Sequence, residues 1–217
     1  MGLMKIVAAI CLLFSCAAFG LDPASSQNGA NIRFSFNNPQ LQPSAYTLQV
    51  FENGSGSYSA GGPDVQAADH AIRIQAPLLA KLFQVARANH FFATDCESKQ
   101  HGIAFTGKKT LNYSGSDGSG SCTFNYSHDA ALNQMASDLM AVAYTLQTGE
   151  RLKSEHRYDR LSLNSELEAL QNAAKDRQAL ELENIAPELQ SIADDDAVMN
   201  LARNRARALL SESSPVP

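Results

Sequence analysis

Alternating apolar and polar residues mark the chain after residue 30 as strand-forming. Over 31–36 this alternation puts every second side chain on one face, as in a strand with one buried side. The segment 46–60 contains two such strands around Asn53-Gly54, a pair that supplies the positive φ angles of a two-residue hairpin turn. A shorter alternation predicts one more strand over 71–75.

A second hairpin and two amphipathic helices are predicted from the middle of the chain. The hairpin covers 108–127, and its connection over 115–120 consists of Gly, Ser and Asp, so we expect a long and mobile turn. Apolar residues spaced by three and four predict helices over 77–89 and 129–148. Gly149 stands where a residue in the left-handed conformation would end the second helix.

The composition changes near residue 150, beyond which strand-forming residues are rare. Apolar stripes predict three further helical segments, and Ser165-x-x-Glu168 is typical of a capping box. The stretch that begins at Ile185 resembles one pair of helices from a HEAT-type array. Because a single pair cannot form a solenoid core, we expect this tail to dock on the rest of the chain.

These patterns predict an α+β fold, in which a small antiparallel sheet of two hairpins carries helices on one face and is followed by a helical C-terminal unit. The α+β domain covers 31–149 and the helical unit 150–217. Antiparallel sheets can leave one face in water, so the uncovered face is the expected place for a partner. Phe51, Tyr58 and Thr123 are candidates for that face.

The N-terminus has the pattern of a secretory signal peptide over 1–20: one positive charge, an apolar run, and small residues before the cleavage point. A polar, flexible leader is expected over 21–30. The sequence therefore predicts a secreted or periplasmic protein. The segment ending at Cys16 also resembles a lipobox, but Phe14 stands where that motif has a small residue. Simple cleavage is the expectation, with a lipid anchor at Cys16 as the alternative.

Cleavage after residue 20 leaves two cysteines, Cys96 and Cys122, in an oxidising compartment, where we expect a disulfide. It would close a loop of 27 residues and stabilise the fold by about 3.5 kcal/mol through the entropy of the unfolded chain. Cys96 could instead be a nucleophile with His90 or His101 as its base. The spacing of His90, Cys96 and His101 matches no paired-ligand zinc pattern, so no metal site is predicted.

The charge balance and the absence of known motifs argue against several classes of function. With 22 acidic and 17 basic residues the net charge is −5, which argues against a nucleic-acid partner. The arginines at 203, 205 and 207 are interpreted as a solvated helix face. No apolar run after the leader is long enough for a transmembrane helix. The sequence contains neither a Gly-x-Ser-x-Gly elbow nor a phosphate-binding glycine motif, so no cofactor is predicted.

No histidine stands in a recognisable catalytic pattern, and His101 is the best of weak candidates because it lies near the cysteine pair and two lysines. The sequence therefore predicts a non-catalytic interaction module, with no catalytic residue assigned and with an envelope or extracellular protein as partner. The alternative is a hydrolase whose site is assembled from residues distant in sequence. A pocket in which His90, His101 or His128 meets a carboxylate and a hydroxyl would favour that alternative.

The hairpin pattern over 46–58, the strand 108–113, the long helix and the helical tail together resemble a set of uncharacterised secreted proteins of soil bacteria. The shared positions are hairpin and core residues. The resemblance accordingly implies neither an activity nor functional residues.

Overall fold

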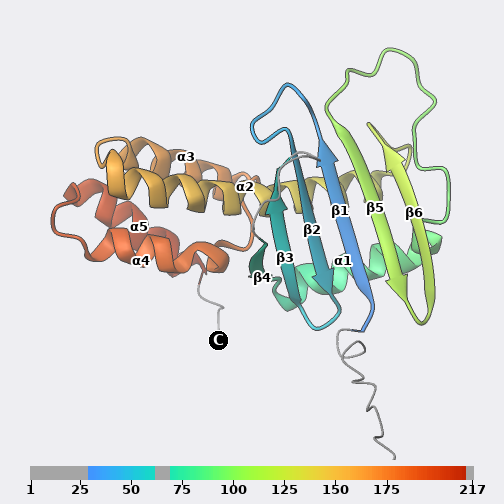
Figure 1. Cartoon of the computed structure of the whole chain (residues 1–217), viewed down its shortest axis with the longest axis horizontal. Coiled ribbons are helices and arrows are strands. Elements are labelled where there is room, and N and C mark those ends of the chain that lie inside the picture. The colour runs from blue at the N-terminus through green and yellow to red at the C-terminus, as the bar shows by residue number, and fades with distance from the viewer. Residues whose placement is uncertain (1–28, 62–68, 214–217) are drawn as a thin grey trace, which may run out of the picture.

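A computed structural model describes residues 29–61 and 69–213. It confirms the α+β fold, with one six-stranded antiparallel sheet and a helical C-terminal region (Figure 1). The predicted signal peptide 1–20 lies outside the described residues, as does most of the predicted leader 21–30. The end of that leader is not flexible, because Ala30 is buried in the hydrophobic core directly before the first strand, and its carbonyl accepts the Glu52 backbone N–H at 2.9 Å.

The four strands of the two predicted hairpins form one sheet with two further strands, which lie close to the strands predicted over 31–36 and 71–75. The strands are β1 (Asn31–Asn37), β2 (Ala45–Phe51), β3 (Ser55–Ala60), β4 (His70–Arg73), β5 (Lys108–Gly115) and β6 (Gly118–Phe124). Their order is β4-β3-β2-β1-β5-β6, so β1 lies between the hairpins and β4 and β6 form the edges. Buried and exposed residues alternate along the strands because only one face is covered.

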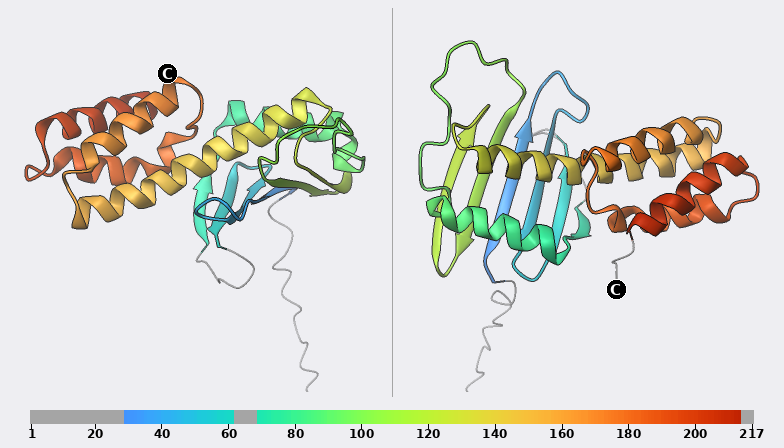
Figure 2. Two further views of the ribbon diagram at one scale, coloured as in Figure 1. Left: turned by 90° about the horizontal axis from the view of Figure 1, so that it is seen from above. Right: turned by 180° about the vertical axis from the view of Figure 1, so that it is seen from behind.

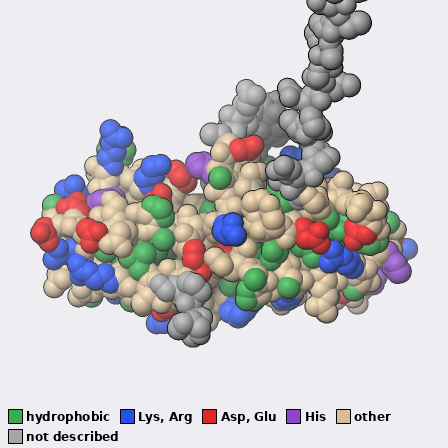
Figure 3. Space-filling view, turned by 90° about the horizontal axis from the view of Figure 1, so that it is seen from below, with side chains coloured by type: hydrophobic (Ala, Val, Ile, Leu, Met, Phe, Trp, Pro, Cys, Tyr) green, Lys and Arg blue, Asp and Glu red, His purple; other side chains and the backbone are tan. Residues whose placement is uncertain are grey.

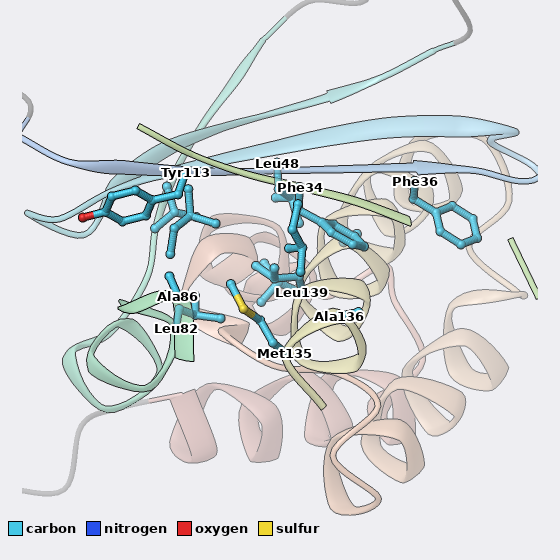
Figure 4. Packing of buried hydrophobic residues seen from close by; sticks show 14 of the residues in the cluster. Phe34, Phe36, Leu48, Leu82, Ala86, Tyr113, Met135, Ala136 and Leu139 are labelled. Atoms are coloured by element: carbon cyan, nitrogen blue, oxygen red, sulfur yellow. The ribbon is translucent and has the colours of Figure 1, made fainter. Parts of the chain in front are cut away.

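Helices cover one face of the sheet and build the C-terminal unit. They are α1 (Ala76–Ala88), η1 (His90–Phe92), α2 (Ala130–Tyr158), α3 (Leu163–Lys175), η2 (Leu182–Ile185), α4 (Ala186–Asp194) and α5 (Asn200–Ser213). Seen from behind, α1 and the first half of α2 cross the sheet side by side (Figure 2). Their apolar side chains meet those of the central strands, with Leu82 and Met135 facing Phe34 and Leu48 (Figure 4).

Both predictions about the hairpin turns are wrong. Three residues, not two, separate β2 from β3, and of the pair Asn53-Gly54 only Gly54 has a positive φ, of 82°. The connection between β5 and β6 is instead tight, since Gly115 pairs directly with Gly118. The glycines of this turn accommodate η1 and do not make a mobile loop: a Cβ at Gly120 would lie 2.5 Å from the carbonyl oxygen of Phe91.

The helix α2 does not end at Gly149, contrary to the prediction, but continues for nine more residues to Tyr158. Gly149 is buried, and the side chain of Ile185 occupies the space that a Cβ there would need. This glycine therefore permits a close contact between α2 and η2 and does not cap a helix. The predicted capping box is wrong as well, because α3 begins at Leu163 and Ser165 lies inside it.

The structure has two hydrophobic clusters, which α2 connects. The first fills the space between the sheet, α1 and the first half of α2 and extends to Leu146. The second begins at Leu152 and is enclosed by the rest of α2 with α3, η2, α4 and α5. The helical unit lies beyond the β4 edge of the sheet, so the two parts are arranged end to end (Figure 1).

Side chains of the helical unit hydrogen-bond the backbone at the β4 edge of the sheet. Asn184 Oδ1 accepts from the Arg73 backbone N–H (2.8 Å), and Asn184 Nδ2 donates to the Arg73 carbonyl (2.9 Å). The backbone N–H of Gln75, two residues after Arg73, donates to Glu181 Oε2 (2.7 Å). The unit thus satisfies backbone groups that an edge strand would otherwise leave open to another chain.

Candidate functional site

The three histidines considered as catalytic candidates are not assembled into a site. His90 begins η1, His101 lies in the loop before β5, and His128 precedes α2. All three are exposed, and within the described ranges none of their side chains forms a hydrogen bond or an ion pair. The pocket that would have favoured a hydrolase is therefore not built by these residues.

The predicted disulfide between Cys96 and Cys122 is confirmed. Their Cα atoms lie 5.8 Å apart, and the bond ties the segment after η1 to β6. Cys96 is therefore neither a nucleophile nor a metal ligand. Residues 29–61 and 69–213 contain no group of three His, Cys, Asp or Glu side chains that could hold a metal ion.

The uncovered side of the sheet faces the viewer in Figure 1 and is the first candidate surface. We call it the open face and define it by the outward residues of the five longer strands: Asn31, Arg33, Ser35, Asn37, Ala45, Thr47, Gln49, Phe51, Ser55, Ser57, Ser59, Lys108, Thr110, Asn112, Ser114, Ser119, Ser121 and Thr123, together with Ala71 and Arg73 of β4. A hollow of about 400 Å³ lies on it.

Of the three residues proposed for this face, Phe51 and Thr123 lie on it, but Tyr58 does not. Tyr58 is only 3% exposed and points into the first hydrophobic cluster beneath the sheet. The alternation along 46–60 would have placed Tyr58 correctly if the turn had been assigned three residues. An additional residue in a hairpin turn reverses which side chains of the return strand point inward.

Hydroxyl groups form a continuous row across the open face. Ser59, Thr47, Ser35, Thr110 and Thr123 are neighbours in register on five adjacent strands. Ser35 Oγ and Thr47 Oγ1 are 3.3 Å apart, and Thr110 Oγ1 and Thr123 Oγ1 are 2.9 Å apart. The next row is also polar and contains Ser57, Gln49, Arg33, Asn112 and Ser121.

The open face differs in charge from the chain as a whole. Its outward residues include three cations, Arg33, Arg73 and Lys108, and no carboxylate, although the chain carries a net charge of −5. None of these three cationic groups is within ion-pair distance of a described acidic side chain. Among the described residues, Asp69, at the margin of the hollow, is the one acidic residue that lines it.

Most of the remaining described cations form ion pairs or hydrogen bonds. The surface seen from below carries positive and negative side chains side by side (Figure 3). The arginines at 203, 205 and 207, expected to form a solvated helix face, instead contact groups of the helical unit. Arg203 pairs with Asp196, Arg205 pairs with Glu168 at 3.0 Å, and Arg207 donates to a backbone carbonyl. They hold helices together and present no basic patch.

A smaller hollow, of about 230 Å³, lies where the sheet meets the helical unit. We call it the junction cleft; Tyr58, His70, Glu150 and Glu188 are among the residues that line it. His70 Nδ1 lies 3.9 Å from Glu150 Oε1, and both side chains are about half exposed. Tyr58 Oη is buried without a hydrogen bond of ordinary geometry. Burial raises the pKa of Tyr58, while its interaction with the Gln147 side chain lowers it.

Sequence reasoning missed both His70 and the buried Lys109. Lys109 Nζ donates to Thr106 Oγ1 and to the carbonyls of Gly107 and Asn125 at 2.8–3.1 Å, and burial lowers the pKa of this ammonium group. These bonds fix the loop before β5 to the end of β6. The only sequence signal was that Lys109 occupies an inward position of its strand.

A comparison with known protein families finds no family model that matches this chain, and a comparison with curated proteins finds no similar protein. The function must therefore be argued from the surfaces described above.

Proposed function

We propose that the protein is an exported, non-catalytic binding module that recognises its partner through the open face of the sheet. The observation that carries this proposal is the asymmetry of the sheet. Helices cover one side of the sheet, whereas the other side is a polar surface that is continuous from β3 to β6 and has a hollow of about 400 Å³. Binding surfaces are commonly presented by rigid elements of this kind, because their side chains are already ordered.

Export is supported by the disulfide and by the N-terminal pattern. A structural disulfide fits an oxidising compartment, either the periplasm or the exterior. The chain is accordingly proposed to be secreted or periplasmic after removal of residues 1–20, with a lipid anchor at Cys16 as the alternative. Over the ranges that the structure describes, no helix has both the length and the apolarity that a membrane span requires.

The alternative function, a hydrolase, finds its best support in the junction cleft, where His70 lies near a carboxylate and a hydroxyl. A general base must reach its nucleophile within about 3.2 Å, directly or through one water molecule. Here the hydroxyl of Tyr58 is buried, and His70 is not hydrogen-bonded to Glu150 at 3.9 Å. The cleft thus lacks the activated nucleophile that catalysis of this class needs, and the binding module is the better interpretation.

A site-specific crosslinking experiment tests the open face directly. A photoreactive amino acid is placed at Thr47 or Thr110 on that face, or at Ser137, an exposed position on α2, as the matched control. After irradiation of cells that export the protein, we expect covalent adducts from the two open-face positions and none from Ser137. Adducts from Ser137 alone, or from no position, would contradict the proposal.

A further inference from the structure

We infer that the ligand of the open face is a carboxylated polysaccharide, an inference that rests on the proposed binding function. It follows from three properties of the face: ordered hydroxyl and amide groups, cations without acidic partners, and a centre without apolar side chains.

The ordered polar groups suit a ligand that is itself covered with hydroxyls. The row Ser59, Thr47, Ser35, Thr110 and Thr123 runs across the strands, and neighbouring strands are about 4.8 Å apart. Each hydroxyl can donate one hydrogen bond and accept others. The row therefore offers a series of donors and acceptors along one line, which matches an extended polymer with repeated hydroxyl groups.

The cations select for negative charge on that polymer. Arg33 lies on the central strand β1, with Gln49 and Asn112 beside it in register, and its exposed guanidinium has no described acidic partner. Lys108 and Arg73 are exposed near opposite ends of the sheet. A guanidinium can bind a carboxylate through two parallel hydrogen bonds, and the amides beside Arg33 can add more. The open face therefore carries positive charge without acidic partners among the described residues, although the chain as a whole is acidic. This charge is complementary to an anionic ligand.

The absence of apolar side chains from the middle of the face argues against a protein partner. Protein interfaces have a core that is depleted in charge and enriched in aromatic residues. Here the apolar outward residues, Ala45, Phe51 and Ala71, lie at strand ends or on the short edge strand. The two central rows are polar from β3 to β6, so little apolar area could be buried there. Affinity must come from hydrogen bonds and charge, which a carboxylated sugar polymer supplies.

The test is affinity electrophoresis of the whole exported protein in gels that contain polygalacturonate, with neutral dextran as the comparison. We expect retardation by polygalacturonate only, and weaker retardation as the salt concentration rises. Arg33→Gln should weaken the apparent affinity about tenfold, and Thr110→Val severalfold. Lys175→Gln, which removes an exposed charge on α3 of the helical unit, is the matched control and should change nothing.

Because Arg33 and Thr110 side chains point to solvent, their variants should melt at the wild-type temperature, so a loss of binding is not a loss of folding. The inference is overturned if polygalacturonate does not retard the protein, if dextran retards it equally, or if Arg33→Gln and Lys175→Gln behave alike. Crosslinking from Thr47 to a protein partner would overturn this inference while leaving the open face as the binding surface. Failure of the crosslinking experiment described above would overturn the proposed function itself.

Discussion

Glu181 is the group whose replacement most directly tests the contact between the sheet and the helical unit. It has left-handed backbone angles, with φ 59° and ψ 47°, immediately before η2. Its Oε2 accepts the Gln75 backbone N–H at 2.7 Å. The pKa of this carboxyl is raised from 4.5 to about 7, chiefly because the group is buried; the hydrogen bond from Gln75 offsets part of the rise, and the charge of Glu183 adds to it. The carboxyl is thus held at the junction in surroundings that disfavour its charge.

The sign of the pH effect follows from the raised pKa of Glu181. Below pH 4.5 the carboxyl is protonated in both the folded and the unfolded chain. Between pH 4.5 and about 7 the unfolded chain releases the proton and the folded chain keeps it, so stability falls as pH rises. A pKa difference of this size corresponds to at most about 3.4 kcal/mol. Because the side chain is partly exposed, solvent screening reduces the expected effect to about 1–2 kcal/mol.

Replacing Glu181 by Gln keeps an oxygen that can accept the bond from Gln75 and removes the charge. The free energy of unfolding, measured by urea denaturation at pH 4, 6 and 8, should equal that of wild type at pH 4. At pH 8 the variant should be more stable by about 1–2 kcal/mol. Glu212→Gln, which removes an exposed carboxyl on α5, serves as the control and should show no such trend. A Glu181→Gln difference that is constant with pH, or negative at pH 8, would refute the reasoning.

Four further changes test other parts of the structure. Gly149→Ala should destabilise the protein by about 1–3 kcal/mol because overpacking against Ile185 outweighs better helix propensity, and a double-mutant cycle with Ile185→Ala should show positive coupling. Replacing Cys96 and Cys122 by Ser should cost about 3.5 kcal/mol, while thiol titration of the denatured wild-type protein should find no free thiol. A chain that ends at Gly149 should melt lower or aggregate, because the β4 edge loses its cover. His101→Ala, at an exposed position without a described partner, should leave the melting temperature unchanged.

The strands could be predicted because a half-buried sheet imposes a local period of two on the sequence. Residues 31–36 and 46–51 showed this period, and the structure has β1 and β2 there. The same period over 108–113 places Thr110 and Asn112 on one face of the strand and the core side chain of Leu111 on the other face. The polar character of the open face could therefore be predicted from the sequence, because these strands have polar residues at the positions that face away from the core.

Glycine was the residue most often misread, because its role depends on what approaches it in space. Gly120 and Gly149 resemble a flexible turn and a helix end in the sequence alone. In the structure both lie in regular elements, where the Phe91 carbonyl and the Ile185 side chain come too close for any Cβ. The approaching groups are 29 and 36 positions away in the sequence, so no local pattern could reveal them.

The junction between the two parts could not be predicted for the same reason. Asn184 reaches the backbone of Arg73 across a sequence separation of 111, and Glu181 reaches Gln75 across 106. A single sequence shows these residues only as polar positions near the start of a helix. His70, which lines the junction cleft, was likewise hidden at the start of a short edge strand.

We expect the two hydrophobic clusters to unfold together, because the continuous helix α2 belongs to both of them. Leu146 belongs to the first cluster and Leu152 to the second, only six residues further along the same helix. If the second cluster melted, α2 would fray back towards Gly149, release Ile185 and uncover the backbone groups of Arg73. Each of these losses falls on the sheet that carries the open face. The helical unit therefore supports the open face from the edge of the sheet, without contributing a side chain to it.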